Sequence, residues 1–122
     1  MFLHLSHTKT PVFQQSQNLA LECYQITGSF PSEEKFVMVQ QIRRAVLSVH
    51  LNIAEGCSRK SIAERKRYYE IARGPVIEID AAIGLAFKLQ SLGTLIVSCF
   101  KQLSAMIGTV RRILNSLLII HS

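Results

Sequence analysis

Apolar side chains recur at alternating steps of three and four along most of the chain, and this spacing limits the possible folds more than any other feature. Val39, Ile42, Val46, Val49 and Ile53 are one example. Residues spaced in this way lie on one face of an α-helix. No segment of any length shows the apolar-polar alternation of a strand. The sequence therefore predicts an all-α fold.

The same spacing, with the residues that interrupt it, separates four helices. Gly28 and the Phe30-Pro31 pair end the first helix, because the residue before a proline avoids the helical region. Pro31 or Ser32 then starts the second, and Gly93 marks the end of the third. The predicted helices span residues 12–27, 32–55, 61–91 and 94–119. Short turns between them favour an antiparallel up-and-down four-helix bundle, formed by one domain of residues 1–122.

The corner between the second and third helices is rich in polar residues and reads "NIAEGCSRKSIAE". Gly56 is expected to take the left-handed conformation that closes a helix. Ser61 and Glu64 have the spacing of a capping box. We therefore predict a structural turn, made by Asn52, Glu55, Gly56, Ser61 and Glu64.

Gly74-Pro75 lies inside the third apolar run. A proline there removes a hydrogen bond and clashes with the carbonyl of Ile71, which costs about 3 kcal/mol. The apolar spacing nevertheless continues across the pair. We predict one long helix with a kink.

The fourth segment has two adjacent apolar stripes. One contains Leu103, Ile107, Val110, Leu114 and Leu117, and the other contains Met106, Ile113 and Ile120. This face is wider than one bundle seam requires. It indicates burial against another subunit in addition to the bundle's own core.

The sequence offers no convincing catalytic, metal or cofactor site. No glutamate is followed three residues later by a histidine, as di-metal bundles require, and no phosphate-binding glycine pattern occurs. The three cysteines are too far apart for a zinc site and favour a reducing cytoplasm. The longest apolar stretch, "LGTLIVSCF", is too short to span a bilayer. We expect a cytoplasmic, non-enzymatic protein without cofactors and without a membrane partner.

Positive charge is concentrated in the second and third helices. The chain has a net charge of +6 and a pI near 9.6. Between residues 43 and 73 eight basic residues stand against three acids, a net of +5, namely Arg43, Arg44, Arg59, Lys60, Arg65, Lys66, Arg67 and Arg73. If the turn is centred near residue 58, Arg44 lies level with Arg73. Such bands of charge favour contact with an RNA or DNA backbone.

Other interpretations of these residues stay open. Glu70 is three or four residues from Lys66, Arg67 and Arg73, so the basic face can be partly neutralised in place. No recognition-helix or RNA-binding signature supports base-specific readout. Two adjacent tyrosines, Tyr68 and Tyr69, could stack on bases, although the spacing assigns at least one of them to the core.

Four segments resemble the "four helix bundle protein" family, also called the 23S ribosomal RNA intervening-sequence protein family. They are "TGSFPSEEKF", "QIRRAVLSV", "NIAEGCSRKS" and "ERKRYYEIARG". The resemblance covers Thr27 to Gly74 closely, and the flanking helices agree in periodicity. By motif, Arg43, Arg44 and Arg59 match basic positions of the family, and Arg67 matches a later arginine. Two departures are His50-Leu51, where relatives commonly have Pro-Ser, and Pro75, where they commonly have Ser.

The resemblance implies a bundle that assembles as a ring, typically a homopentamer, without established enzymatic activity. A related branch includes the accessory variability determinant of diversity-generating retroelements. That determinant is a basic barrel that binds nucleic acid and a reverse transcriptase. The resemblance therefore implies that the chain associates with itself, binds nucleic acid and can contact a reverse transcriptase or another protein.

These observations lead to three hypotheses. In the first, a homo-oligomeric scaffold binds RNA or DNA backbone through the basic helical hairpin. In the second, the ring is purely structural or protein-binding, and its arginines form ion pairs between subunits. The third and most distant hypothesis is a metal-dependent nuclease.

Overall fold

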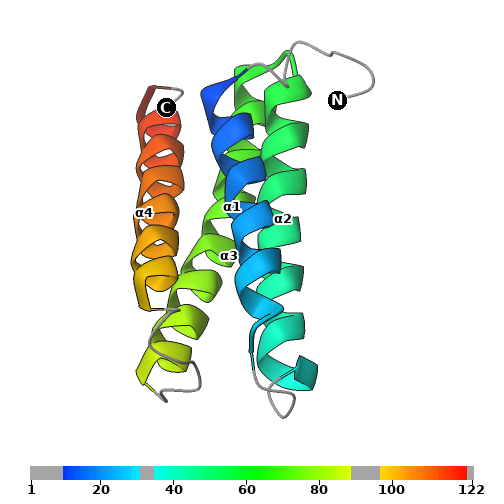
Figure 1. Ribbon diagram of the computed structural model, residues 1–122. Coiled ribbons are helices and arrows are strands. Elements are labelled where there is room, and N and C mark those ends of the chain that lie inside the picture. The colour runs from blue at the N-terminus through cyan, green and yellow to red at the C-terminus, as the bar shows by residue number, and fades with distance from the viewer. Residues whose placement is uncertain (1–9, 31–34, 89–96, 121–122) are drawn as a thin grey trace.

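Four α-helices and one π-helical turn make up the described part of the chain (Figure 1). The computed structural model describes residues 10–30, 35–88 and 97–120. In chain order the elements are α1 (Pro11–Thr27), η3 (Lys35–Val39), α2 (Gln40–Ser58), α3 (Ile62–Lys88) and α4 (Val97–Ile120). All elements in these ranges are helical, which confirms the predicted all-α class.

Each helix packs against its neighbours in the sequence, and α1 also packs against α4. In Figure 1 the chain descends through α1, rises through α2, descends through α3 and rises through α4. Side-chain contacts between α1 and α2 agree with these chain directions. Thr10 Oγ1 at the start of α1 lies 3.4 Å from Cys57 Sγ near the end of α2. Arg43 near the start of α2 donates to the Tyr24 carbonyl near the end of α1. These two helices therefore run in opposite directions.

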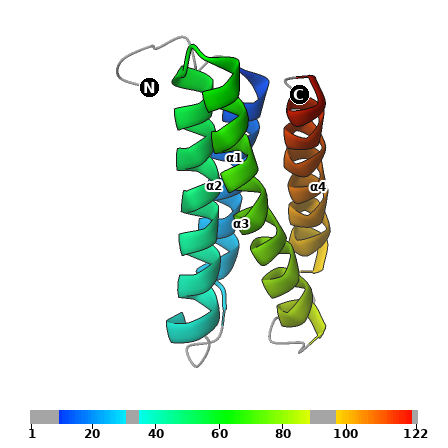
Figure 2. The same ribbon diagram turned by 180° about the vertical axis from the view of Figure 1, so that it is seen from behind.

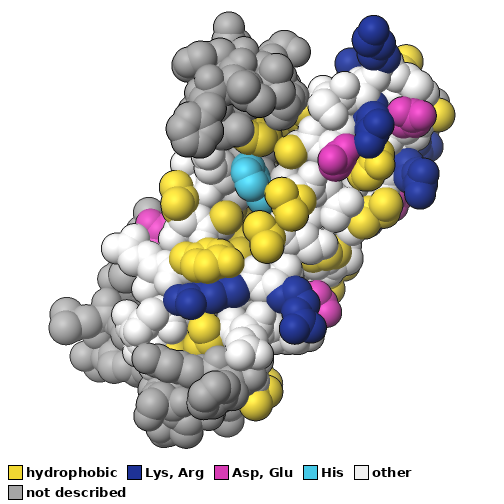
Figure 3. All heavy atoms as spheres, turned by 90° about the vertical axis from the view of Figure 1, so that its right-hand side faces the viewer, with side chains coloured by type: hydrophobic (Ala, Val, Ile, Leu, Met, Phe, Trp, Pro, Cys, Tyr) yellow, Lys and Arg dark blue, Asp and Glu magenta, His cyan; other side chains and the backbone are white. Residues whose placement is uncertain are grey.

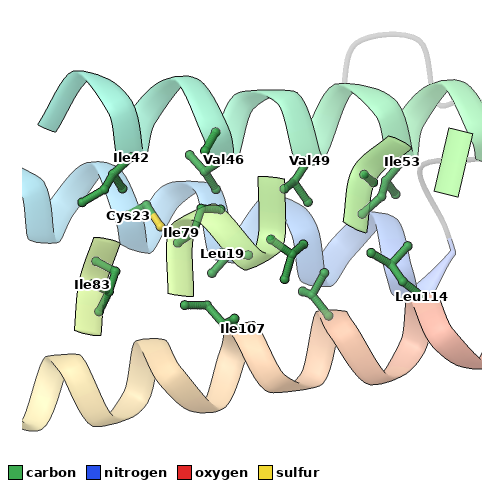
Figure 4. Close-up of a cluster of buried hydrophobic side chains, with 14 of the residues drawn as sticks. Leu19, Cys23, Ile42, Val46, Val49, Ile53, Ile79, Ile83, Ile107 and Leu114 are labelled. Carbon is green, nitrogen blue, oxygen red and sulfur yellow. The ribbon is translucent and has the colours of Figure 1, made fainter. Parts of the chain in front are cut away.

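The apolar stripes of the helices meet in a common core (Figure 4). The residues that α2 contributes, Ile42, Val46, Val49 and Ile53, are fully buried. They meet buried side chains from the other helices, which include Leu19, Cys23, Val76, Ile79, Ile83, Ile107, Val110 and Leu114. Burying one such aliphatic side chain contributes about 1.5–3 kcal/mol. The spacing of three and four thus identified the interior faces correctly.

The ends of α1 follow from local chemistry. The Thr10 side chain accepts a hydrogen bond from the Phe13 backbone N–H at 3.3 Å, and Pro11 occupies the first helical position. Proline is tolerated there because its missing N–H would have no partner inside the helix. At the other end the Gly28 N–H bonds to carbonyls of the last turn. The helix begins one residue before the predicted start and ends at the predicted residue.

The boundaries of α2 differ from the prediction. The predicted start at Pro31 or Ser32 lies outside the described residues, and η3 leads directly into α2 at Gln40. The predicted end at Glu55 is wrong, because α2 continues to Ser58. The described part of α3 begins at Ile62 and ends at Lys88, so the predicted end at residue 91 and the predicted start of the fourth helix at residue 94 lie outside the described ranges.

The Gly74-Pro75 pair does not divide α3. The helix is assigned without interruption from Ile62 to Lys88 with Pro75 inside it, as predicted. Figures 1 and 2 show α3 as one ribbon that crosses the bundle at a slant. Pro75 is partly buried and Gly74 is exposed.

None of the described helices is long and apolar enough to cross a membrane.

Candidate nucleic-acid interface

The turn between α2 and α3 is formed by Arg59, Lys60 and Ser61. Arg59 leaves the helix with an extended backbone, and its N–H bonds to the Gly56 carbonyl at 3.3 Å. Ser61 Oγ accepts a hydrogen bond from the Glu64 N–H at 3.3 Å, which is the N-cap half of the predicted capping box. The start of α3 therefore agrees with the sequence-based prediction, whereas α2 ends later than predicted.

The predicted role of Gly56 as the residue that closes the second helix is wrong. Asn52, Glu55 and Gly56 all lie inside α2. The Asn52 side-chain amide donates to the Ser48 carbonyl one turn earlier, at 2.8 Å. A helix-closing glycine takes the left-handed conformation, whereas Gly56 continues the helix and is buried.

Gly56 leaves room for two tyrosines of α3. A Cβ built at position 56 would lie 2.7 Å from Tyr69 Cε1 and 3.2 Å from Tyr68 Cβ. Tyr69 is buried, and its hydroxyl donates to Cys57 Sγ at 3.6 Å. Burial raises the pKa of Tyr69, and the Cys57 contact raises it further. The hydroxyl therefore stays protonated and anchors the end of α2 to α3.

Arg59 is held in a network at the tip of the hairpin. Its Nη2 lies 2.6 Å from Glu55 Oε2 and donates to the Tyr68 hydroxyl at 3.1 Å. Its guanidinium carbon is 5.0 Å from the centre of the Tyr68 ring, within the range of a cation–π contact. Arg65 Nε donates to the Arg59 carbonyl. Glu55 thus forms an ion pair with the arginine four residues later in the chain.

One donor in this network has no partner. Arg59 Nε is shielded from solvent, and no acceptor among the described residues reaches it. A buried N–H without an acceptor is costly, and such groups are uncommon in folded proteins.

Two of the eight predicted contact residues are engaged elsewhere. Arg43 Nε donates to Thr27 Oγ1 at 2.9 Å, its Nη2 donates to the Tyr24 carbonyl at 3.1 Å, and its guanidinium lies over the Tyr24 ring at 4.8 Å. It therefore secures the end of α1. Arg73 Nη1 lies 3.5 Å from Glu70 Oε2, both partly exposed, so this pair contributes little to stability.

The remaining basic side chains are less constrained. Within the described residues, no hydrogen bond or ion pair involves the side chains of Arg44, Lys60, Lys66 or Arg67. Arg44, Lys60 and Arg67 are exposed, and Lys66 is partly exposed. Figure 3 shows Lys and Arg side chains gathered toward the upper right of one face, with Asp or Glu among them. We define the tip cluster as Arg59, Lys60, Arg65, Lys66 and Arg67.

The predicted alignment of Arg44 with Arg73 is shifted. Since α2 ends at Ser58 and α3 begins at Ile62, the hairpin is centred on residue 60, two residues later than assumed. At 1.5 Å per residue, Arg44 is then level with about residue 76, roughly 4.5 Å further along α3 than Arg73. Arg44 therefore stands apart from the tip cluster.

Two arginines of α4 were not included among the predicted contacts. Arg111 and Arg112 are exposed, and Arg112 Nη2 donates to Thr109 Oγ1 at 3.3 Å. The midpoint between the end of α3 and the start of α4 lies near residue 92. Arg111 is then level with about residue 73, since α3 and α4 pack together. The two adjacent arginines in "TVRRIL" are the sequence signal for this pair.

His50, which is half-buried, pairs with the buried Ser16 between α1 and α2. Ser16 is fully buried, and its hydroxyl donates to the Phe13 carbonyl at 2.9 Å. Ser16 Oγ also shares a hydrogen bond with His50 Nδ1, 2.8 Å away. The His50 ring also contacts Phe13 at 4.8 Å, and desolvation lowers the pKa of His50. This serine–histidine pair is a packing element, because the serine oxygen is inaccessible to a substrate.

The described residues contain no group of three or more His, Cys, Asp or Glu side chains placed to hold a metal ion.

Sequence comparison identifies the family. The model of the 23S rRNA-intervening sequence protein family matches residues 8–116. The chain belongs to the 23S rRNA-intervening sequence protein family. This match includes all eight predicted contact residues and extends the resemblance well beyond Thr27–Gly74. No curated protein is significantly similar to this family member.

One solved structure places this family member among known folds. It is a protein of unknown function from the S23 ribosomal protein family of Bacteroides thetaiotaomicron VPI-5482. The two superpose with a TM-score of 0.76 over 88% of this chain and 94% of the other, at 21% identity. At this identity the likeness establishes the shared fold alone.

Proposed function

We propose that this family member is a non-enzymatic, cytoplasmic, homo-oligomeric scaffold that binds the backbone of RNA or DNA through the tip cluster. The observation that carries the proposal is the presence of Lys60, Lys66 and Arg67 on one hairpin corner without an acidic partner among the described residues.

Phosphate contacts of this kind have a measurable signature. Each phosphate neutralised by Lys or Arg releases condensed counterions, so the logarithm of affinity falls with the logarithm of salt concentration. If Lys60, Lys66 and Arg67 each neutralise one phosphate, the plot of log affinity against log salt concentration should have a slope of about −3 on duplex DNA and about −2 on a single strand. Arg111 and Arg112 would steepen it if the nucleic acid also crosses α4.

Fluorescence anisotropy with labelled mixed-sequence 20-mers of RNA and DNA tests the proposal. We expect binding at low salt that weakens along the predicted slope. Lys66→Gln should weaken binding and reduce the slope by about one unit. Lys88→Gln is the matched control, because Lys88 is an exposed lysine at the other end of the same helix. Absence of binding at low salt, or an equal effect of both substitutions, would contradict the proposal.

Exposed apolar side chains favour the assembly of copies into a ring. Leu47 and Leu51 on α2 are 46% and 53% exposed, and Ile77 and Leu85 on α3 are 56% and 54% exposed. Large exposed apolar surfaces commonly mark interaction sites. We propose that the α2 face of one copy packs against the α3 face of the next, a head-to-tail contact that forms a ring when the rotation between copies closes. The family resemblance leads us to expect five copies in that ring.

Light scattering during size-exclusion chromatography measures this assembly. Leu51→Gln and Ile77→Gln should each reduce the assembly to smaller species, whereas Leu21→Gln on the outer side of α1 should not. The wild-type protein eluting as a monomer at micromolar concentration would contradict the ring.

The second hypothesis, a ring held by arginine ion pairs, makes a different prediction for Arg44. Arg44→Glu should dissociate the assembly if Arg44 bridges subunits. If Arg44 instead contributes to nucleic-acid binding, the assembly should stay intact while the affinity for the 20-mers falls.

A further inference from the structure

The tip cluster surrounds one accessible aromatic ring. Tyr68 is partly exposed, whereas the neighbouring Tyr69 is buried in the core. The structure thus resolves the ambiguity of the tyrosine pair. Tyr69 anchors the hairpin, and Tyr68 is left among the arginines at the surface.

The two arginines beside Tyr68 are held differently. Arg59 is fixed by Glu55 and by the Tyr68 hydroxyl, with its guanidinium 5.0 Å from the ring centre. Arg67 is exposed, and its guanidinium is 5.9 Å from the ring centre, at the outer limit of a cation–π contact. Within the described residues, no hydrogen bond or ion pair holds the Arg67 side chain. The ring is therefore supported firmly by Arg59 and only loosely by Arg67, which can move aside.

A flat, polarisable group is suited to the space that Arg67 covers. Nucleobases stack on aromatic rings and on guanidinium planes whatever their identity, because every base has a π-face. Arg67 directly precedes Tyr68, and its guanidinium lies 5.9 Å from the ring centre, so it can contact a phosphate beside a stacked base. In a duplex the bases are already stacked on one another, so only an unpaired nucleotide presents a free face.

We propose that the tip cluster binds unpaired nucleotides, with a base stacked on Tyr68 and an adjacent phosphate contacted by Arg67. This proposal rests on the proposed function and specifies its ligand as single-stranded nucleic acid. The same contacts are available to RNA and to DNA, since neither base stacking nor phosphate contact involves the 2′-hydroxyl.

Competition between single-stranded and duplex probes tests the proposal. Single-stranded RNA and DNA 12-mers of mixed sequence, each with one central 2-aminopurine, are compared with the same strands in duplexes. We expect the single strands to bind more tightly, and the 2-aminopurine fluorescence to fall on binding as the base stacks. Tyr68→Leu should weaken single-strand binding about tenfold, abolish the fluorescence change and leave duplex binding unchanged. Tyr68→Phe should keep both the tighter binding of single strands and the fall in 2-aminopurine fluorescence.

Tyr24→Leu is the matched control. Tyr24 is also exposed and also has an arginine over its ring, at 4.8 Å, but it lies near the end of α1 that is away from the hairpin tip. This substitution should leave the affinity for every probe unchanged.

The outcomes separate the two proposals. Equal affinity for single strands and duplexes, with no loss in Tyr68→Leu, would overturn the stacking proposal and leave backbone binding intact. No binding of any probe at low salt would overturn both. If Tyr68→Leu does not fold, the wild-type 2-aminopurine signal decides, because bound single strands without a fluorescence change would show that no base is stacked.

Discussion

A β-carbon on Gly56 would lie 2.7 Å from Cε1 and 2.9 Å from Cδ1 of Tyr69. The α2 backbone therefore approaches the tyrosine ring more closely than any residue with a side chain permits. This approach lets Tyr69 reach Cys57 and lets α2 continue to Ser58 before the chain turns. The glycine serves packing between helices, and the position of the tip cluster depends on it.

Gly56→Ala should destabilise the protein by about 1–3 kcal/mol, because a buried methyl group must displace the Tyr69 ring. Urea unfolding followed by circular dichroism at 222 nm measures this. Gly84→Ala is the control. Gly84 is helical and exposed, and an added Cβ meets nothing within 4 Å, so alanine should stabilise by up to about 1 kcal/mol. Equal effects of the two substitutions would contradict the packing role.

Arg43→Gln should lower the free energy of unfolding by about 1–2 kcal/mol, because hydrogen bonds from a charged group to the end of α1 are lost. The neighbouring Arg44→Gln should change it by less than about 0.5 kcal/mol, as expected for an exposed side chain without partners. Thermal unfolding of both variants measures the difference. If Arg44→Gln proves the more destabilising, the assignment of Arg43 to the fold is wrong.

Stability should fall on mild acidification because of His50. Its pKa is lowered in the folded state by desolvation, from an ordinary value of 6.5. Between that lowered value and 6.5 the unfolded chain binds more protons, so the free energy of unfolding decreases as the pH drops below 6.5, by at most about 1.4 kcal/mol per pH unit. Above pH 6.5 the contribution is constant.

Urea unfolding midpoints between pH 5 and 8 measure this dependence. His50→Gln removes the titrating group and should flatten the curve below pH 6.5. A variant with the same pH dependence as the wild type would show that other groups are responsible.

Pro75→Ala should raise the thermal midpoint, because alanine restores an N–H to the interior of α3 and removes the clash with the Ile71 carbonyl. The gain should be about 1 kcal/mol or more, less than the full cost of about 3 kcal/mol because the native helix already accommodates the ring. Pro11→Ala is the control, since Pro11 lies at the first position of α1, where proline has no such cost. A lower midpoint for Pro75→Ala would show that the proline contributes through packing.

The sequence by itself determined which helix faces form the interior. The steps of three and four identified the core residues of α2, including Ile42, Val46 and Ile53, because helical periodicity and burial depend on residues close together in the chain. Ser61 and Glu64 likewise gave the start of α3, because a cap is made between residues three apart. The concentration of positive charge on the hairpin could also be predicted from the order of the residues alone.

Only the tertiary structure decided how individual polar and small residues are used. The sequence assigned Gly56 to a turn, whereas contact with Tyr69, thirteen residues away, keeps it inside a helix. Arg43 was grouped with Arg44, but only Arg43 reaches α1. Tyr68 and Tyr69 are adjacent and of one type, yet one is buried and the other is partly exposed. These distinctions arise from contacts between helices, which depend on distances in space that local spacing does not encode.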